Sequence, residues 1–289
     1  MRWFAATVVL SLLAAPRQAQ KPLPDQQVFL EETRKHLDTD ADRQTGYMYT
    51  ETRRMQKLDK SGHASGESIK ILESYPGLPG EERWERVLSE DGRAVPPPEL
   101  ERRDRERQKH VEEYARKLEK EPAQTKAKEE RERERRRREL SESIDDIPRV
   151  YDVRMVGREV IDGHDAIVIA LTPRPDAKPR TRNGDIMRKF NARAWISESE
   201  YQLIRLDVEA IDTVSFGLGM LARVHKGSRA SFQRRKVNDE SWLPALATYS
   251  FSVRVGLVAV MRRGGSVEFS NYKKFGVDSS YRIATPDGK

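Results

Sequence analysis

The strongest local pattern in this chain lies at residues 192–209, with the sequence ARAWISESEYQLIRLDVE. Over residues 204–209 apolar residues alternate with charged ones, which is the two-residue period of a strand with one buried and one solvated face. A short acidic stretch at residues 197–200 separates this strand from the preceding one, so the unit predicts a β-hairpin. Similar strand-like pieces fill residues 149–275 and contain no catalytic motif. We therefore expect a shaped β-surface rather than an enzyme.

The N-terminus has the features of a secretory signal peptide. Met1 and Arg2 precede an apolar run over residues 3–15, which matches the charged start and short hydrophobic core of such a peptide. The run is shorter than the roughly 20 residues that a membrane-spanning helix needs. We expect residues 1–20 to be cleaved and the mature protein to lie in the periplasm, free or peripheral to a membrane. A buried N-terminal helix is the alternative.

The composition excludes several kinds of site. The chain has no cysteine, so it has no disulfides, no thiolate metal sites and no lipid attached through an N-terminal cysteine. Its 5 histidines show no metal-ligand spacing, and we expect neither a metal nor a cofactor. The net charge is +7, but Lys+Arg 54 stand against Asp+Glu 47, so the chain is highly charged with both signs. We do not expect a nucleic-acid partner.

The composition also divides the chain into segments. A stretch dominated by Arg, Lys and Glu interrupts the strand-like runs, and opposite charges recur in it at helical spacing. Pro122 predicts a break between two helices there. After the signal peptide we expect an N-terminal helix with the first strands, the charged helical insertion, the remaining strands and a C-terminal tail, at residues 21–98, 99–142, 143–276 and 277–289.

The order of these segments predicts the fold class. Many strands with the helices gathered in one insertion favour a mainly β (α+β) fold, with a single curved antiparallel sheet and helices on one side. Residues 166–171, AIVIAL, are apolar on both faces, so this strand should be covered on both sides. One cover can be the helices and the other a lined hollow. Residues 173–184, rich in Pro, Arg and Lys, predict a mobile loop.

A set of local patterns in the second half resembles the LolA-like family of periplasmic outer-membrane lipoprotein carriers and lipid-binding relatives. The patterns are a strand ending in Trp195-Ile196, the acidic turn, the strand at 203–208, a turn into Trp242-Leu243-Pro244 and a closing strand through Phe251. The resemblance implies an unclosed half-barrel, here of about nine to eleven strands, whose apolar groove under a helical lid takes an acyl chain, lipid or lipoprotein. The long charged insertion departs from the family pattern.

Two groups of residues are candidates for binding. Apolar side chains of the sheet can line the groove, although each of them can instead belong to an ordinary core. The groove candidates are Trp195, Ile204, Leu206, Val208, Tyr249, Phe251, Val253 and Val168. Arginines of the insertion can contact an anionic membrane surface or an envelope protein, although interleaved glutamates also favour a solvated helix. These candidates are Arg131, Arg133, Arg135, Arg136, Arg137 and Arg138.

These features favour one function and leave an alternative. We expect a non-catalytic periplasmic protein that binds a lipid or lipidated protein in an apolar groove, as carrier or sensor in envelope lipid and lipoprotein trafficking. The alternative is an envelope interaction protein that binds a partner or an anionic surface through the Arg/Glu-rich helices. No Ser/His/Asp set has a local signature, and a hydrolase stays open only because active-site residues can be scattered along a sequence.

Overall fold

The computed structural model describes residues 21–37, 46–59, 61, 63–78, 82–119, 123–216, 222–255 and 259–274. The predicted signal peptide and C-terminal tail lie outside the described residues. Within the described part, no helix combines the length and the apolar character that crossing a membrane requires.

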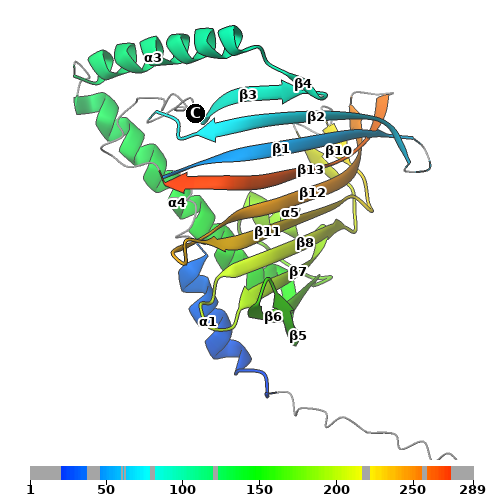
Figure 1. Cartoon of the computed structure of the whole chain (residues 1–289). Coiled ribbons are helices and arrows are strands. Elements are labelled where there is room, and N and C mark those ends of the chain that lie inside the picture. Colours follow the sequence, from blue (N-terminus) through cyan, green and yellow to red (C-terminus); the bar gives the residue numbers. More distant parts are fainter. Residues whose placement is uncertain are drawn as a thin grey trace, which may run out of the picture.

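Within the described residues, thirteen strands form one curved, unclosed antiparallel sheet, which confirms the predicted fold class (Figure 1). The predicted count of about nine to eleven strands is too low, because three further strands have only two or three residues, namely Arg93–Ala94, Val214–Phe216 and Ala222–Val224. The strand order is β4-β3-β2-β1-β13-β12-β11-β8-β7-β6-β5, with β10 on β12 and β9 on β10. The first and last strands of this order have no common partner, so the sheet does not close. The strands are β1 (Tyr47–Leu58), β2 (Ala64–Tyr75), β3 (Trp84–Glu90), β4 (Arg93–Ala94), β5 (Tyr151–Ile161), β6 (His164–Pro173), β7 (Phe190–Ser197), β8 (Leu203–Ala210), β9 (Val214–Phe216), β10 (Ala222–Val224), β11 (Arg229–Val237), β12 (Ser241–Val255) and β13 (Ala259–Lys274).

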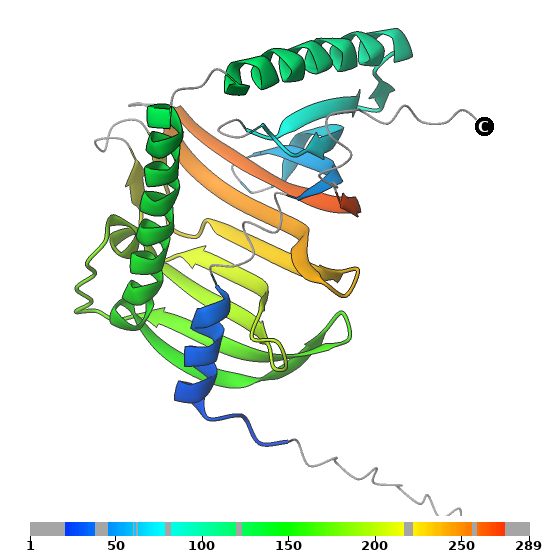
Figure 2. The same cartoon turned by 90° about the vertical axis from the view of Figure 1, so that its left-hand side faces the viewer.

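The helices cover parts of this sheet. They are α1 (Gln26–His36), α3 (Pro97–Glu119), α4 (Ala123–Val150) and α5 (Arg182–Met187). Helix α3 ends at Glu119 and α4 begins at Ala123, so the charged stretch forms two helices, while the predicted break near Pro122 itself lies outside the described residues. Helix α3 runs along β3, where Arg86 donates to both carboxylate oxygens of Asp104 at 2.8 and 2.9 Å. Helix α4 lies beside α1 (Figure 2), and an ion pair between Arg34 and Asp145 joins them.

The hydrophobic core fills both faces of the β6–β8 region. On one face, Phe29 of α1 packs against Ile167, Ile169, Ala194 and Ile196, and we call this the helix face. On the opposite face, a second cluster lies around two tryptophans, and we call this the tryptophan face. That cluster consists of Ala166, Val168, Trp195, Ile204 and Trp242.

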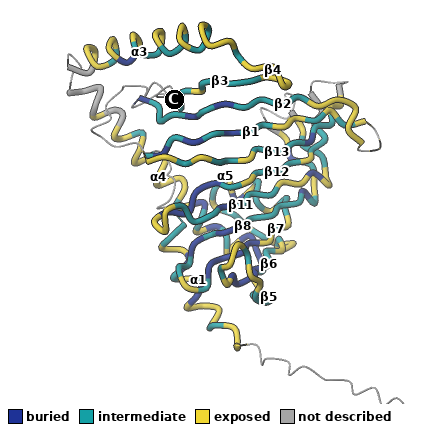
Figure 3. The backbone as a smooth tube through the Cα atoms, in the orientation of Figure 1, coloured by how far each residue is buried: buried dark blue, intermediate teal, exposed yellow. Residues whose placement is uncertain are grey.

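The predicted burial of residues 166–171 on both sides is confirmed for Ala166–Ile169, which are at most 3% exposed. At this strand, side chains of the tryptophan cluster occupy the second side, where the sequence suggested a hollow. Buried residues gather in this part of the sheet, whereas α3 is largely exposed (Figure 3).

A single buried carboxylate fixes the segment that follows β6. Asp146 of α4 is 1% exposed and accepts hydrogen bonds from the backbone N–H of Arg180 at 3.0 Å and of Thr181 at 2.8 Å. The Thr181 hydroxyl donates to it at 2.7 Å and also caps α5 by accepting from the Gly184 N–H. A Cβ at Gly184 would lie 2.5 Å from the Asp146 carboxylate, so only glycine fits. The loop predicted over 173–184 is therefore wrong at its end, where α5 begins.

We expect Asp146→Asn to lower the free energy of unfolding by about 1–3 kcal/mol at neutral pH, since an amide –NH2 cannot accept from the Arg180 and Thr181 N–H groups. Burial raises the pKa of the Asp146 carboxyl, but the hydrogen bonds from Arg180 and Thr181 outweigh it and hold the pKa below its ordinary 3.8. The stabilisation is therefore complete above the ordinary value and is lost as the pH falls through the lower folded value.

Urea unfolding at neutral pH and through the acid range measures both effects. The exposed Glu142, on the same helix, provides a matched control as Glu142→Gln. Equal losses in the two variants, or an unchanged acid dependence in Asp146→Asn, would contradict the role of this carboxylate.

Candidate functional site

A row of apolar and small residues crosses the helix face. Its members are direct antiparallel partners on neighbouring strands, so their side chains stand next to one another on the same face. From β6 to β1 the row, called the apolar row below, consists of Leu171, Ala192, Val208, Ala230, Tyr249, Gly265 and Met55. No charged residue interrupts it.

Large and small residues alternate along the apolar row. Ala192, Ala230 and Gly265 stand between longer side chains, so only a methyl group or bare backbone rises from the sheet at those positions. At Gly265 the glycine is required, because a Cβ there would lie 2.7 Å from the Tyr249 hydroxyl oxygen. The Tyr249 ring therefore lies over the β13 backbone, and it also stacks on Phe251 with ring centroids 5.3 Å apart.

Large apolar side chains on both sides of the row remain accessible. Met55 is 49% exposed and Met261, the direct partner of Val253, is 40% exposed. Ala230 is exposed, and Tyr249 and Phe251 are only partly buried. Methionine adapts its shape to irregular apolar partners, so a methionine-flanked patch suits a flexible hydrocarbon ligand.

The structure divides the groove candidates between the two faces. Leu206, by its pairing with Ala194 and its packing near Phe29, lies on the helix face. The other candidates on that face are Val208, Tyr249, Phe251 and Val253. Those on the tryptophan face are Val168, Trp195 and Ile204, with exposures of 2%, 4% and 0%. These last three pack in the core, and the structure does not bring them together with the others.

A β-bulge explains why the alternation at residues 204–209 misplaces one residue. Trp195 pairs with Arg205 while Ile196 pairs with Leu203, which leaves Ile204 as the extra residue. Around a bulge two successive side chains point to the same side, so Ile204 and Arg205 both lie on the tryptophan face. A strict period of two would have placed Ile204 with Leu206.

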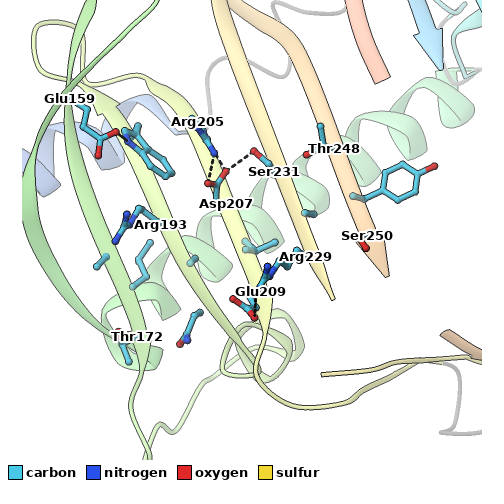
Figure 4. A pocket seen from close by; sticks show the side chains of 18 residues that line it. Glu159, Thr172, Arg193, Arg205, Asp207, Glu209, Arg229, Ser231, Thr248 and Ser250 are labelled. Atoms are coloured by element: carbon cyan, nitrogen blue, oxygen red, sulfur yellow. Dashed lines mark hydrogen bonds and ion pairs between the residues drawn. The ribbon is translucent and has the colours of Figure 1, made fainter. Parts of the chain in front are cut away.

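The tryptophan face carries an open depression of about 900 Å³ across β6, β7, β8, β11 and β12 (Figure 4). Its lining is polar, and most charges there pair with each other. Arg205 donates to Asp207 at 2.9 and 2.6 Å, Ser231 donates to Asp207 at 2.6 Å, and Arg229 donates to Glu209 at 3.0 Å. An acyl chain would have to desolvate these groups without replacing their water, so this depression does not suit hydrocarbon.

The arginine candidates form an exposed run on α4. Arg135 pairs with Glu132 at 2.7 Å. Among the side chains that the structure describes, a set that leaves out Glu129, no ion pair involves Arg131, Arg133, Arg136 or Arg138, and all four arginines are exposed. Among the residues that the structure describes, no group of three or more His, Cys, Asp or Glu side chains could hold a metal ion.

Sequence reasoning missed the small residues and methionines of the helix face. Ala192, Ala230, Gly265, Met55 and Met261 lie on four different strands, and only the strand register brings them together. Neither alanine nor glycine marks a ligand site in a sequence. The alternation of large and small residues can be seen only across strands.

No protein-family model matches the chain, and no characterised protein matches it in sequence. Solved structures that are similar to it include a LolA superfamily protein from Nitrosomonas europaea, with 10% identity, 90% of this chain and 98% of that chain covered, and a TM-score of 0.28. An outer-membrane lipoprotein-sorting protein domain from Vibrio parahaemolyticus has 10% identity, coverage of 89% and 100%, and a TM-score of 0.34. The MucA/MucB complex of Pseudomonas aeruginosa gives 11% identity, coverage of 86% and 99%, and a TM-score of 0.24. At such scores these likenesses carry no functional conclusion.

The two faces should respond differently to truncation. We expect Ile204→Ala to lower the free energy of unfolding by about 2–5 kcal/mol, because it opens a cavity in the tryptophan cluster. Met55→Ala should cost about 0.5 kcal/mol or less, because that side chain is half exposed. Urea unfolding monitored by tryptophan fluorescence measures both values. A loss in Met55→Ala as large as that in Ile204→Ala would show that the Met55 end of the apolar row is packed as core as well.

Proposed function

We propose that this protein binds the acyl chain of a lipid or of a lipidated protein along the apolar row, and acts as a carrier or sensor in the cell envelope. The observation that carries this proposal is the apolar row itself. It is uncharged from β6 to β1, is flanked by accessible methionines, and lies on the face that α1 partly covers. Binding of this kind needs no catalytic group.

The length of the apolar row is adequate for one acyl chain. Neighbouring strands are about 4.8 Å apart, so the row extends over about 29 Å. The hydrocarbon core of a bilayer is about 30 Å thick and holds two layers of chains, so one chain needs about 15 Å. The positions of Ala192 and Ala230 allow such a chain to approach the backbone between the longer side chains, whereas the Tyr249 ring covers Gly265.

The energetics are also sufficient. Burial of about 15 methylenes is worth on the order of 10 kcal/mol before the costs of association are subtracted. The ligand would in turn cover Met55, Met261 and Phe251, whose exposure to water is otherwise unfavourable. The sequence resemblance to LolA-like carriers and the predicted signal peptide support a periplasmic location for this function.

A bulky side chain in the middle of the row tests the proposal. Ala230 is exposed on the helix face, and Ala230→Trp should obstruct an acyl chain without entering the core. We expect this change to weaken binding of a fluorescent fatty acid by about tenfold or more, equivalent to about 1.4 kcal/mol. Ser250→Trp is the matched control, because Ser250 is exposed on the neighbouring strand and its side chain lies on the tryptophan face.

Fluorescence titration of both variants, with urea unfolding to confirm that they fold, gives the comparison. Equal binding by Ala230→Trp and the wild type would exclude the apolar row as the site. A native mass spectrum of protein purified from its own host gives an independent check. Repeated recovery of empty protein, together with no fatty-acid uptake in solution, would overturn the proposal.

A second candidate function concerns the arginine run of α4. Arg131, Arg133, Arg136 and Arg138 are exposed, and within the described residues no carboxylate pairs with them. Each basic side chain near an anionic membrane surface contributes about 1 kcal/mol of attraction. We propose that this run brings the protein to an anionic envelope surface, a role that is compatible with acyl-chain binding elsewhere.

We expect the wild type to sediment with vesicles of phosphatidylcholine and phosphatidylglycerol, and less so as salt is raised, because salt screens exposed charges. Replacing these four arginines by glutamine should remove the binding and leave fatty-acid uptake unchanged. Vesicles of phosphatidylcholine alone are the control. Equal sedimentation with both vesicle types would rule out an electrostatic role for the run.

A further inference from the structure

Within the part of the chain that the structure describes, the outer edge of β5 is not paired with any strand. Among the described strands β5 is the last of the sheet and pairs with β6 alone, so one side of its backbone faces outward. Such an edge is a template for pairing with another chain, and proteins usually cover it or place charges along it. The opposite edge of the sheet is different, because β4 has only Arg93 and Ala94.

Side chains occupy the first half of this edge. The Gln26 side-chain amide donates to the Val153 carbonyl at 3.0 Å and accepts from the Met155 N–H at 3.1 Å. One side-chain amide thus makes the two bonds, to the carbonyl of Val153 and from the N–H of Met155, that the N–H and C=O of one residue on a neighbouring parallel strand would make. Arg174 donates to the Tyr151 carbonyl at 3.0 Å and continues the cover. The backbone groups here are therefore placed to accept a strand.

The second half of the edge begins at a β-bulge at Val156 and carries two exposed valines beside the charged Arg158 and Glu159. Val156 is 52% exposed and Val160 is 67% exposed. The charged residues between them are engaged elsewhere. Arg158 donates to Glu198 at 2.6 Å and to the Lys21 carbonyl at 2.7 Å, and Glu159 accepts from the Trp195 indole at 2.8 Å. The charge of Arg158 is therefore paired with Glu198, while the exposed Glu159 keeps its charge beside the indole of Trp195.

We propose that the outer edge of β5 is a docking strand for an extended, uncharged segment of a partner protein. The segment adds one strand beside residues 156–161 and replaces the Gln26 amide beside Val153 and Met155. Backbone hydrogen bonds provide the affinity, and Val156 and Val160 select apolar side chains on the incoming strand.

A second copy of this chain is a poorer occupant of the edge. An antiparallel register that packs Val156 against Val160 of another copy also places Arg158 directly opposite Arg158. Like charges opposite each other destabilise a strand pair. Head-to-tail pairing of copies through β4 would bring only two residues to the contact. An uncharged partner segment has neither disadvantage.

The test uses the full chain and a short fluorescein-labelled peptide of alternating threonine and valine. Fluorescence polarisation should show binding of this peptide and no binding of the same peptide N-methylated at every residue, which has no N–H group left to donate to a ladder. The double variant Val156→Lys/Val160→Lys should bind about tenfold or more weakly. Val260→Lys is the matched control, because Val260 is 43% exposed on β13, and it should bind like the wild type. Gln26→Ala should bind severalfold more tightly, since the competing amide is gone.

The contrary outcomes are equally clear. Equal binding of the methylated and unmethylated peptides, no binding of either, or unchanged affinity in the lysine double variant would overturn the proposal. Unchanged affinity in Gln26→Ala would overturn it too, because the amide would then not stand in the path of the ladder. Sedimentation velocity of the free protein covers the remaining case: a dimer that the two lysines dissociate would assign the edge to a second copy instead.

Discussion

The register between neighbouring strands determines which side chains of this protein share a face. An apolar row forms on the helix face only because Val208, Ala230 and Tyr249 are direct partners across β8, β11 and β12. A slip of one residue on any of these strands would exchange its apolar side chains for polar or charged ones. The bulge between Trp195 and Ile196 shows the same constraint on a small scale, because it moves Ile204 to the opposite face.

The antiparallel, unclosed sheet and the two helices of the charged stretch could be predicted from alternation, turn residues and Pro122. The division of the groove candidates could not. Trp195 and Leu206 are equally apolar in sequence, yet the first packs in the core of one face and the second lies on the other. The hydrogen bonds from the Arg180 and Thr181 N–H groups to Asp146 could not be predicted either. In a sequence, a carboxylate within a charge-rich helix is expected to face solvent.

The two faces of the sheet differ in chemistry although they share the same backbone. The tryptophan face carries a packed apolar cluster and, beside it, a depression in which Arg205 and Ser231 donate hydrogen bonds to Asp207. The helix face joins the packing of α1 to an uncharged row that ends at an exposed methionine. A hydrocarbon ligand and a polar ligand would therefore bind to opposite faces of one sheet. The effect of a substitution on one face can then be measured without a change to the other face.

Helix α4 ends at Val150 and β5 begins at Tyr151, so no flexible linker separates the long charged helix from the end strand of the sheet. Pro148 lies inside the last turns of this helix, where it removes one backbone hydrogen bond, and Asp146 ties the preceding turn to the segment after β6. Helix α4 is thus held near its C-terminal end by Asp146 and continues directly into β5. A displacement of its arginine-rich part would therefore either bend the helix at Pro148 or move β5.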